Sequence, residues 1–574
     1  MDDIEKPPTA PEGHHDDQSR HRLSKDEELT PSTPVQGQRL SQPEDSDSES
    51  NPDSQDGEER GGESRDLETL SRVSSGPPYS AFSSSMRWWI VFMNCISAFL
   101  SPITANIYFP AIPALAQDLG VPVSKINLTL TTYMILQGLA PTLFGDFADI
   151  AGRRPAFIIA CAIYLGANIG LALQRNYAAL LILRMVQSGG SSGTIALVYG
   201  VVADIAASSE RGKFMGIVGA GLTIGPALGP VIGGLLSQYL GWPSIFWFLT
   251  ILAVCWLIPY VLAVPETGRK VVGNGSIPPQ GWNMTLLDYI RSKRHPVNRP
   301  SNHPRQKLRF PNPLNTLSVI GNKDMALVLG YNACLYMGFN LITATLASQF
   351  ADIYHYNEIQ LGLCYLPIGG ATMISSITTG YILDWNFRRI AKKLGVRVEG
   401  KRGNDLKGFP IEKARLQIAY PLVSLGLIVS IGYGWALHYE THVAVPLVLL
   451  FFIGIGVTGP FQIINVLIVD LYPQAPATAT AANNLCRCLS GAVGTAIIQY
   501  IIDAWGRGWT YTFIALIYGV FSPALWIIQK YGPQWREERM EKMKEAIEKK
   551  EAQAREKAMT TTEQVLTDVQ PTTR

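Results

Sequence analysis

The sequence predicts an all-α membrane protein with twelve transmembrane helices in two pseudo-symmetric halves of six helices. Three observations support this fold class. Hydrophobic residues make up 47% of the 574 residues and charged residues only 16%, although both ends of the chain are strongly polar. Apolar stretches recur between the two ends, each of roughly 18–25 residues, the length at which a helix crosses about 30 Å of hydrocarbon. A long basic loop divides these stretches into two groups of six.

The predicted spans contain Gly and Pro, which a membrane bundle tolerates better than a soluble helix does. This recurrence of full-length apolar stretches disfavours the core of a large soluble protein. The twelve spans are predicted at residues 88–108, 124–144, 156–173, 178–203, 213–237, 245–264, 325–349, 359–383, 415–436, 443–469, 476–502 and 508–529.

The chain divides into five parts by composition. Residues 1–85 are rich in Ser, Asp, Glu, Pro and Gly, which predicts a disordered cytoplasmic tail. Residues 86–264 form the predicted N-terminal six-helix half, and residues 325–530 form the C-terminal half. Residues 265–324 are a central cytoplasmic loop, and residues 531–574 are a cytoplasmic C-terminal tail.

The distribution of Lys and Arg predicts the orientation. Loops on one side hold twenty-four of these residues and loops on the other side hold three. Because cytoplasmic loops carry the excess of positive charge, we expect both termini in the cytoplasm, most simply at the plasma membrane. The formal net charge of +2 gives no reason to expect nucleic acid as a partner.

The sequence contains no pattern that indicates an enzyme. It has no GxxxxGK[ST] phosphate loop, so ATP hydrolysis within this chain is not expected to drive any process. We also find no catalytic triad, paired-carboxylate or metal-ligand pattern. We therefore expect no catalysis, no cofactor and no metal. We expect any transport to be driven by gradients across the membrane.

A charged loop follows the second predicted span. It reads GDFADIAGRRP, in which Gly145 permits a tight helix exit and the charges form a network. The pattern GxxxDxxxRR recurs after the eighth span as Gly380, Asp384, Arg388 and Arg389, which supports an internal repeat. A merely solvated loop is the alternative. The first copy consists of Gly145, Asp149, Arg153 and Arg154, and Asp146 is a further charge of the same loop.

The fourth span contains Arg184 and Gln187 in the segment LRMVQSGG. A charge within hydrocarbon is costly, so Arg184 is a functional candidate. The alternative is an arginine held by a carbonyl group and by packing between helices.

The fifth span contains a strip of small residues. Glycines recur every four residues in and before GPALGPVIGG, which allows close helix approach, and two prolines can bend the same region. A structural seam explains the glycines but not the prolines. The candidate residues are Gly216, Gly221, Gly225, Pro226, Gly229, Pro230, Gly233 and Gly234.

Polar stripes on apolar helices predict a central cavity, since polar groups facing lipid would lack partners. For each residue, a hydrogen bond between helices is an equally good explanation. The candidates are Asn94, Ser97, Ser101 and Thr104 in span one, Asn332, Tyr336 and Asn340 in span seven, Gln462 and Asn465 in span ten, and Asn483, Asn484 and Arg487 in span eleven.

The loop at 145–154 and the segments LRMVQSGG and GPALGPVIGG resemble three signature motifs of the major facilitator superfamily. The resemblance covers roughly residues 88–530 and is nearest to the fungal twelve-span drug:proton antiporters and their organic-acid exporter relatives. It implies that the loop gates the outward-facing state with Asp204 and Glu210, that Arg184 and Gln187 serve proton coupling, and that the GPxxGP segment with Gly216 is typical of antiporters.

We therefore expect a monomeric, proton-coupled exporter of small amphipathic drugs that works by alternating access in the lipid bilayer. The carboxylates of the spans lie only at span edges, which disfavours cationic drugs. One alternative is export of organic acids such as citrate, with Arg184 and Arg487 attracting the carboxylates. The other is a nutrient receptor of the same fold that does not transport.

Overall fold

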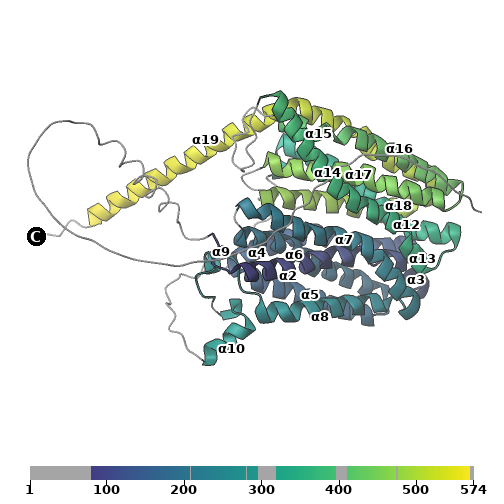
Figure 1. Cartoon of the computed structure of the whole chain (residues 1–574), viewed down its shortest axis with the longest axis horizontal. Helices are drawn as coiled ribbons and strands as arrows, with labels where there is room; N and C mark the ends of the chain where they lie inside the picture. The colour runs from purple at the N-terminus through teal and green to yellow at the C-terminus, as the bar shows by residue number, and fades with distance from the viewer. Residues whose placement is uncertain are drawn as a thin grey trace, which may run out of the picture. The chain divides into compact units, whose positions relative to one another are not determined.

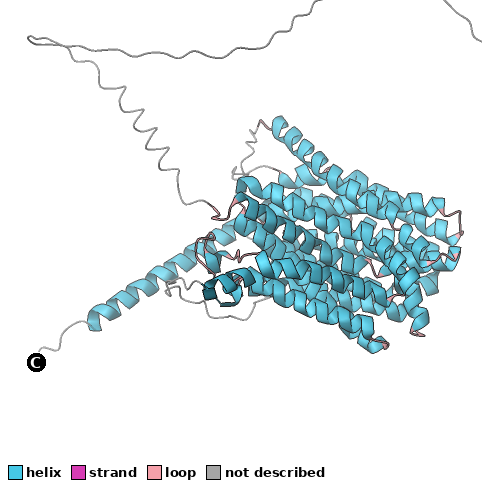
Figure 2. Cartoon of the chain, turned by 60° about the horizontal axis from the view of Figure 1, so that its bottom comes forward, coloured by secondary structure: helices cyan, strands magenta, loops and turns pink. Residues whose placement is uncertain are grey.

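The computed structural model describes residues 79–206, 208–279, 281–294, 319–395, 410–472 and 476–568. All regular elements within these residues are helices (Figure 2). The prediction of an all-α fold is therefore confirmed. Nearly all of the predicted N-terminal tail falls outside the described residues.

The N-terminal half contains six long helices. Short cap and turn interactions define several of their ends; for example, the Asn176 side chain accepts a hydrogen bond from the Ala178 backbone N–H at the start of α6, at 2.9 Å. The helices are α2 (Ser84–Asn106), α4 (Val123–Ala151), α5 (Arg153–Leu173), α6 (Tyr177–Ile205), α7 (Ser208–Leu240) and α8 (Pro243–Ala263), with the short elements η1 (Phe109–Ala111) and α3 (Ile112–Asp118) between α2 and α4.

The central loop is partly helical, and the C-terminal half follows it. The loop elements are α9 (Arg269–Val272), η2 (Gly281–Asn283) and α10 (Leu286–Arg294). The C-terminal half consists of α12 (Lys323–Tyr354), α13 (Glu358–Leu363), α14 (Leu366–Lys393), α15 (Ile411–Leu416), α16 (Ala419–His438), α17 (Ala444–Leu471), α18 (Pro476–Val520) and α19 (Pro523–Asp568).

The helix lengths agree with twelve membrane crossings. Within the described residues, 9 segments are both long and apolar enough to span a bilayer. Helices α4 and α6 are more polar but 29 residues long each, and they pack inside the N-terminal bundle. Helix α18 bends at Gly506, where φ is 73°, so its two arms and the start of α19 supply the last two crossings.

The helices form two groups, purple to teal and green to yellow in Figure 1. We call the end of the bundle where α2 begins and α19 leaves the terminal face, and the opposite end, which holds η1, α3 and α13, the far face. Gly506 belongs to the far face, because the next residue, Arg507, donates to Gln349 near the end of α12. Helices α4 and α18 pack against each other between the two halves, as do α7 and α14.

Polar and aromatic contacts join the halves from the far face to mid-helix depth. Near the far face, the Phe109 and Tyr365 rings stack at 5.9 Å, and the Glu358 backbone N–H donates to Gln238 Oε1 at 3.1 Å. Deeper in the bundle, the Thr131 and Thr495 hydroxyls lie 3.0 Å apart. The halves are thus fastened along the far-face side.

The glycine strip of α7 lies against α2. A Cβ atom on Gly221 would overlap the carbonyl oxygen of Cys95, and one on Gly233 would overlap that of Ile107. Gly225 and Gly229 pack against the same helix at Pro102 and Asn106. Gly234 faces α13 instead, and Gly216 has no neighbour within 4 Å. Both Pro226 and Pro230 lie inside α7.

Helix α19 continues without a break past residue 530 and binds the terminal face of the C-terminal half. Arg539 forms an ion pair with the buried Asp324 at the start of α12, and its Nη2 donates to the Leu471 carbonyl oxygen at 2.6 Å. Arg536 lies 3.4 Å from the fully buried carboxylate of Glu412 in α15. Burial raises the pKa of Glu412, and Arg536 opposes that rise.

We predict that Gly233→Ala destabilises the protein by about 1–3 kcal/mol, because the new methyl group enters a contact between two backbones. Thermal unfolding in detergent should show a lower midpoint. Gly216→Ala is the matched control, since open space surrounds that position. Equal midpoints for both variants would contradict the packing of α7 on α2.

Candidate substrate and coupling sites

Arg184 is completely buried in the N-terminal half and holds a chain of polar contacts. Its Nη1 donates to Gln187 Oε1 at 2.6 Å, and Gln187 Nε2 donates to Asn168 Oδ1 of α5, also at 2.6 Å. The guanidinium carbon lies 4.2 Å from the ring centre of Tyr108 and 4.4 Å from that of Tyr133. The two predicted coupling residues therefore lie together, enclosed by the turn between α2 and η1, by α4 and by α5.

The positive charge of Arg184 has aromatic and amide partners but no acidic one among the described residues. Two of its donors, Nε and Nη2, are buried without a hydrogen-bond acceptor there. Cation–π contacts compensate for part of the lost hydration. A buried cation with unused donors attracts negative charge and repels positive charge, so this site can respond to the charge of a nearby substrate or proton.

The charged loop at residues 145–154 forms an ion-pair network at the terminal face. Arg153 pairs with Asp149 at 2.7 Å and with Asp204 of α6 at 2.9 Å, so three of the predicted gating residues meet. Arg154 instead donates to the carbonyl oxygens of Val261, Val264 and Trp282. The side chain of Glu210 lies outside the described residues.

The helix exit predicted at Gly145 occurs seven residues later. Helix α4 continues to Ala151, and Gly152 ends it with a φ of 109°, a conformation that side chains beyond glycine rarely adopt. Gly145 packs inside the bundle against Ala196. The helix continues through Gly145 because its next two turns still pack against other helices.

Sequence reasoning missed Glu266, which organises this loop. Its carboxylate is buried and accepts four backbone hydrogen bonds, from Arg153 at 2.8 Å, Arg154 at 3.0 Å, Thr267 at 3.0 Å and Gly268 at 2.7 Å. Two of these donors are the free N–H groups at the start of α5. Burial raises the pKa of Glu266, and the backbone donors oppose that rise. The sequence signal was a carboxylate directly after a predicted span.

The second copy of the repeat does not reproduce the network. Arg388 and Arg389 are exposed on α14, which continues to Lys393 instead of ending as α4 does. The counterpart of the Arg153 pair is formed by Arg415, whose Nε lies 3.0 Å from Asp470 Oδ2 at the end of α17. A longer connection before α16 displaces this arginine from the repeated pattern.

The polar stripe of α2 is buried within the N-terminal half and does not face an open cavity. Thr104 is hydrogen bonded to the Tyr164 hydroxyl of α5 at 2.6 Å, which is the alternative of an interhelical bond. The oxygen atoms of Asn94, Ser97 and Ser101 are buried without a partner among the described residues.

In the C-terminal half, three asparagines bind one another. Asn332 Nδ2 donates to Asn483 Oδ1 at 2.7 Å and to Asn465 Oδ1 at 3.0 Å, and Asn483 Nδ2 donates to Asn465 Oδ1 at 2.8 Å. This triad ties α12, α17 and α18 together. Gln462 Nε2 similarly donates to Ser376 Oγ of α14 at 3.4 Å. These residues thus make the interhelical hydrogen bonds that sequence reasoning left open.

Other predicted cavity residues lie where the halves meet. Asn484 Nδ2 donates to the Gln137 carbonyl oxygen of α4 at 2.8 Å, and its Oδ1 accepts from Arg487 at 2.8 Å. The Arg487 guanidinium lies 5.0 Å from the Tyr336 ring centre and 5.9 Å from that of Phe461. Asn340 Nδ2 contacts Met134 Sδ of the other half at 3.6 Å. These residues form an aromatic and cationic cluster beside the interface of the halves.

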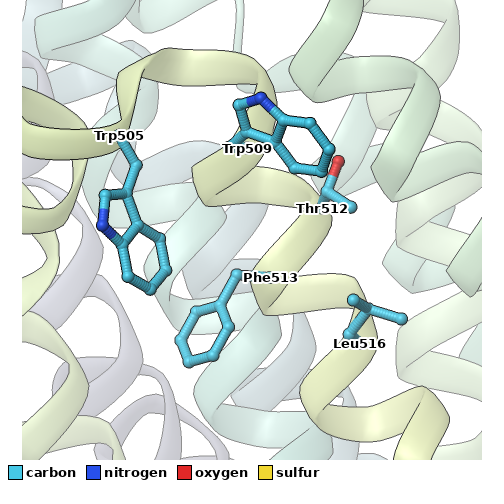
Figure 3. A pocket seen from close by; sticks show the side chains of 5 residues that line it. All are labelled: Trp505, Trp509, Thr512, Phe513 and Leu516. Carbon is cyan, nitrogen blue, oxygen red and sulfur yellow. The ribbon is translucent and has the colours of Figure 1, made fainter.

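A separate groove of about 380 Å³ lies on the outer surface of α18 and is lined by aromatic and apolar side chains (Figure 3). Trp505, Trp509 and Phe513 are exposed there, on either side of the bend at Gly506. Exposed tryptophans at the end of membrane-length helices are typical of the interfacial aromatic belt. We therefore assign this groove to the surface facing lipid and not to the polar sites above.

No group of three or more His, Cys, Asp or Glu side chains that could hold a metal ion occurs in the described part of the chain.

Two six-helix groups with buried polar clusters and a charged loop at one face define a class of polytopic membrane transport proteins. The Major Facilitator Superfamily profile matches residues 95–495, so this chain belongs to that family.

Several named proteins are similar in sequence to this chain over most of its length. It is 44% identical over 472 residues to the MFS-type transporter phiD of Fungal sp. (strain ATCC 74256), covering 81% of this chain and 72% of that protein. It is 41% identical to the MFS-type transporter tstD of Talaromyces stipitatus, covering 83% and 88%. Citrate exporter 1 of Aspergillus niger is 36% identical over 496 residues, covering 85% and 94%.

Solved structures support the fold. The D-xylose-proton symporter matches with a TM-score of 0.54 at 14% identity, covering 76% of this chain and 98% of that one. The human organic anion transporter MFSD10 (TETRAN) matches with a TM-score of 0.50 at 17% identity, covering 78% and 100%. The prediction of the major facilitator fold is confirmed.

We predict that Glu266→Gln lowers stability by about 1–3 kcal/mol, because an amide has one acceptor oxygen and leaves buried backbone donors unpaired. Thermal unfolding in detergent measures the loss. Glu440→Gln serves as a control, since its carboxylate is 61% exposed and makes a surface ion pair with Arg507. An unchanged midpoint for Glu266→Gln would show that the loop holds its shape without this carboxylate.

Proposed function

We propose that this chain is a proton-coupled exporter of small amphipathic compounds that works as a monomer in the plasma membrane, with both termini in the cytoplasm. The observation that carries the substrate class is the cluster of Arg487, Tyr336 and Phe461 beside the α4 and α18 contact, which we take as the lining of the substrate path. Aromatic rings suit an apolar body, and a single half-buried cation suits one polar or acidic group.

Alternating access explains how this lining would be reached from each side in turn. The contacts of Phe109 with Tyr365 and of Gln238 with Glu358 close the halves toward the far face. In the proposed cycle these contacts break while contacts toward the terminal face form. The ion pairs of Arg153 and Arg415 lie within single halves, so each half can move as one body.

Proton coupling is the proposed role of the Arg184 cluster. The pattern of α7 resembles that of antiporters, and the sequence offers no ATP-binding loop. A cation held permanently between Tyr108 and Tyr133 makes the local potential positive. Because protons and substrate both respond to that potential, binding of one changes the affinity for the other. Exchange of protons for substrate requires such coupling.

Charge argues against cationic substrates. Neither Arg184 nor Arg487 forms an ion pair with a carboxylate among the described residues, and no acidic side chain belongs to the lining. Neutral and weakly acidic amphipathic compounds fit this arrangement best.

Export of organic acids such as citrate is the second candidate. Two arginines without acidic partners favour it, as does the 36% identity to Citrate exporter 1. The remaining alternative is a receptor of the same fold that does not transport. Accumulation of substrate in vesicles would distinguish either exporter from such a receptor.

We predict that Arg184→Ala reduces pH-driven efflux by about tenfold or more, because the substitution removes the positive charge to which we assign proton coupling, and a coupling free energy of ~1–3 kcal/mol corresponds to an effect of that size. Proteoliposomes with an imposed pH gradient measure this, and the amount of inserted protein serves as the control for folding. Efflux at the wild-type rate in Arg184→Ala would remove this residue from the mechanism.

We predict that Arg487→Gln leaves pH-driven efflux of a neutral amphipathic dye within about tenfold of wild type, while efflux of an amphipathic monocarboxylate falls further, since the lost interaction is the ionic one. Both compounds are measured in the same proteoliposomes. If citrate is the better substrate and Arg487→Gln stops its export with coupling intact, the organic-acid alternative replaces the first proposal.

A further inference from the structure

The central loop carries an amphipathic helix with an exposed apolar side. Five large side chains of helix α10 and of the segment before it are between 42% and 55% exposed. We call this set the loop-helix face, and it consists of Trp282, Leu286, Leu287, Tyr289 and Ile290. At 100° per residue, the four positions within α10 occupy one arc of the helix, and Asp288 lies opposite.

The base of this helix is firmly attached to the membrane-length helices. The Trp282 ring packs edge-on against Phe147 of α4 at 6.5 Å, and its carbonyl oxygen accepts from Arg154 Nη1 at 3.3 Å. Asn283, Met284 and Thr285 are buried, and the Thr285 hydroxyl accepts from the Asp288 backbone N–H at 2.9 Å. Helix α10 packs on α8 (Figure 1).

This attachment fixes the depth of the loop-helix face. Phe147 lies four residues before the end of α4, and Arg154 is the second residue of α5. The ends of membrane-length helices lie in the headgroup region of a bilayer. A tryptophan at that depth, followed by leucines, a tyrosine and an isoleucine, is the composition of helices that lie in the interface plane.

The charge of helix α10 indicates which kind of lipid surface it would bind. Helix α10 holds three basic residues, Arg291, Lys293 and Arg294, against one acidic residue, Asp288. Lys293 lies over the Tyr289 ring at 5.1 Å, so its ammonium borders the apolar side. Basic residues beside a membrane span complement anionic lipid headgroups, at about 1 kcal/mol for each Lys or Arg near the surface.

We propose that the loop-helix face docks on anionic phospholipids of the leaflet at the terminal face, with its apolar side chains below the headgroups and the basic residues of α10 among the phosphates. The helix thereby attaches the central loop to the bilayer next to the Glu266 and Arg154 contacts.

The test uses the full-length protein in nanodiscs of phosphatidylcholine, with and without phosphatidylserine. Hydrogen exchange measured by mass spectrometry on peptides covering residues 284–294 should slow by about fivefold or more when phosphatidylserine is present, which corresponds to one basic residue engaged with the anionic surface. High salt should remove most of that protection.

The double variant Leu287→Glu with Ile290→Glu should exchange at the phosphatidylcholine rate in both lipids, because carboxylates oppose both burial and the anionic surface. Leu394→Glu is the matched control, since Leu394 is 53% exposed at the end of α14 and Leu287 is 55% exposed. It should keep the protection of α10.

Two results would overturn the proposal. Rapid exchange in both lipids would show that the loop-helix face does not engage the bilayer. Slow exchange in both lipids, insensitive to salt, would show that anionic headgroups are not the ligand and that another segment of the chain or uncharged lipid covers the face. The salt dependence of the wild-type protein decides between these outcomes even if the double variant does not fold.

Discussion

Hydrocarbon offers no hydrogen-bond partner to a backbone, and the described architecture depends on this constraint. Each crossing segment bonds its own N–H and C=O groups within a helix, which is why the described elements are helices of membrane length. Departures from helical geometry occur where helices end: at η1 and Gly506 on the far face and at Gly152 on the terminal face. Glu266 then supplies acceptors for the donors that the start of α5 leaves free.

The same constraint applies to polar side chains, and the two halves satisfy it differently. The N-terminal half buries a full charge, Arg184, and shares it with two aromatic rings and two amides. The C-terminal half contains a neutral triad, in which Asn332, Asn465 and Asn483 hydrogen bond to one another while Asn332 Oδ1 is buried without a partner among the described residues. The pseudo-symmetric fold therefore contains an asymmetric distribution of charge, which favours separate roles for its halves in coupling and in substrate binding.

At the terminal face the two halves use a common device. In each half an arginine pairs with an aspartate at the end of a long helix. Arg153 begins α5 and pairs with Asp204, and Arg415 lies in the last turn of the short α15, just before α16, and pairs with Asp470. Helix α19 adds Arg539 on Asp324 in the C-terminal half, and the central loop adds Glu266 in the N-terminal half. These contacts stiffen each half without joining the two, which is the mechanical condition for a rocking motion between them.

The sequence by itself determined the fold class, because the length and spacing of apolar stretches follow directly from the thickness of a bilayer. It also determined where charge enters that bilayer, at Arg184 and Arg487, since any such residue stands out in an apolar segment. It did not determine partners. The repeated GxxxDxxxRR pattern pointed to Arg388, whereas the tertiary structure uses Arg415, because a salt bridge depends on the distance between helix ends and not on a register in the chain. Likewise the stripe containing Thr104 and the triad containing Asn332 are hydrogen bonded between helices, and only the packing of those helices could assign which polar groups face each other and which, like Arg487, remain beside the interface of the halves.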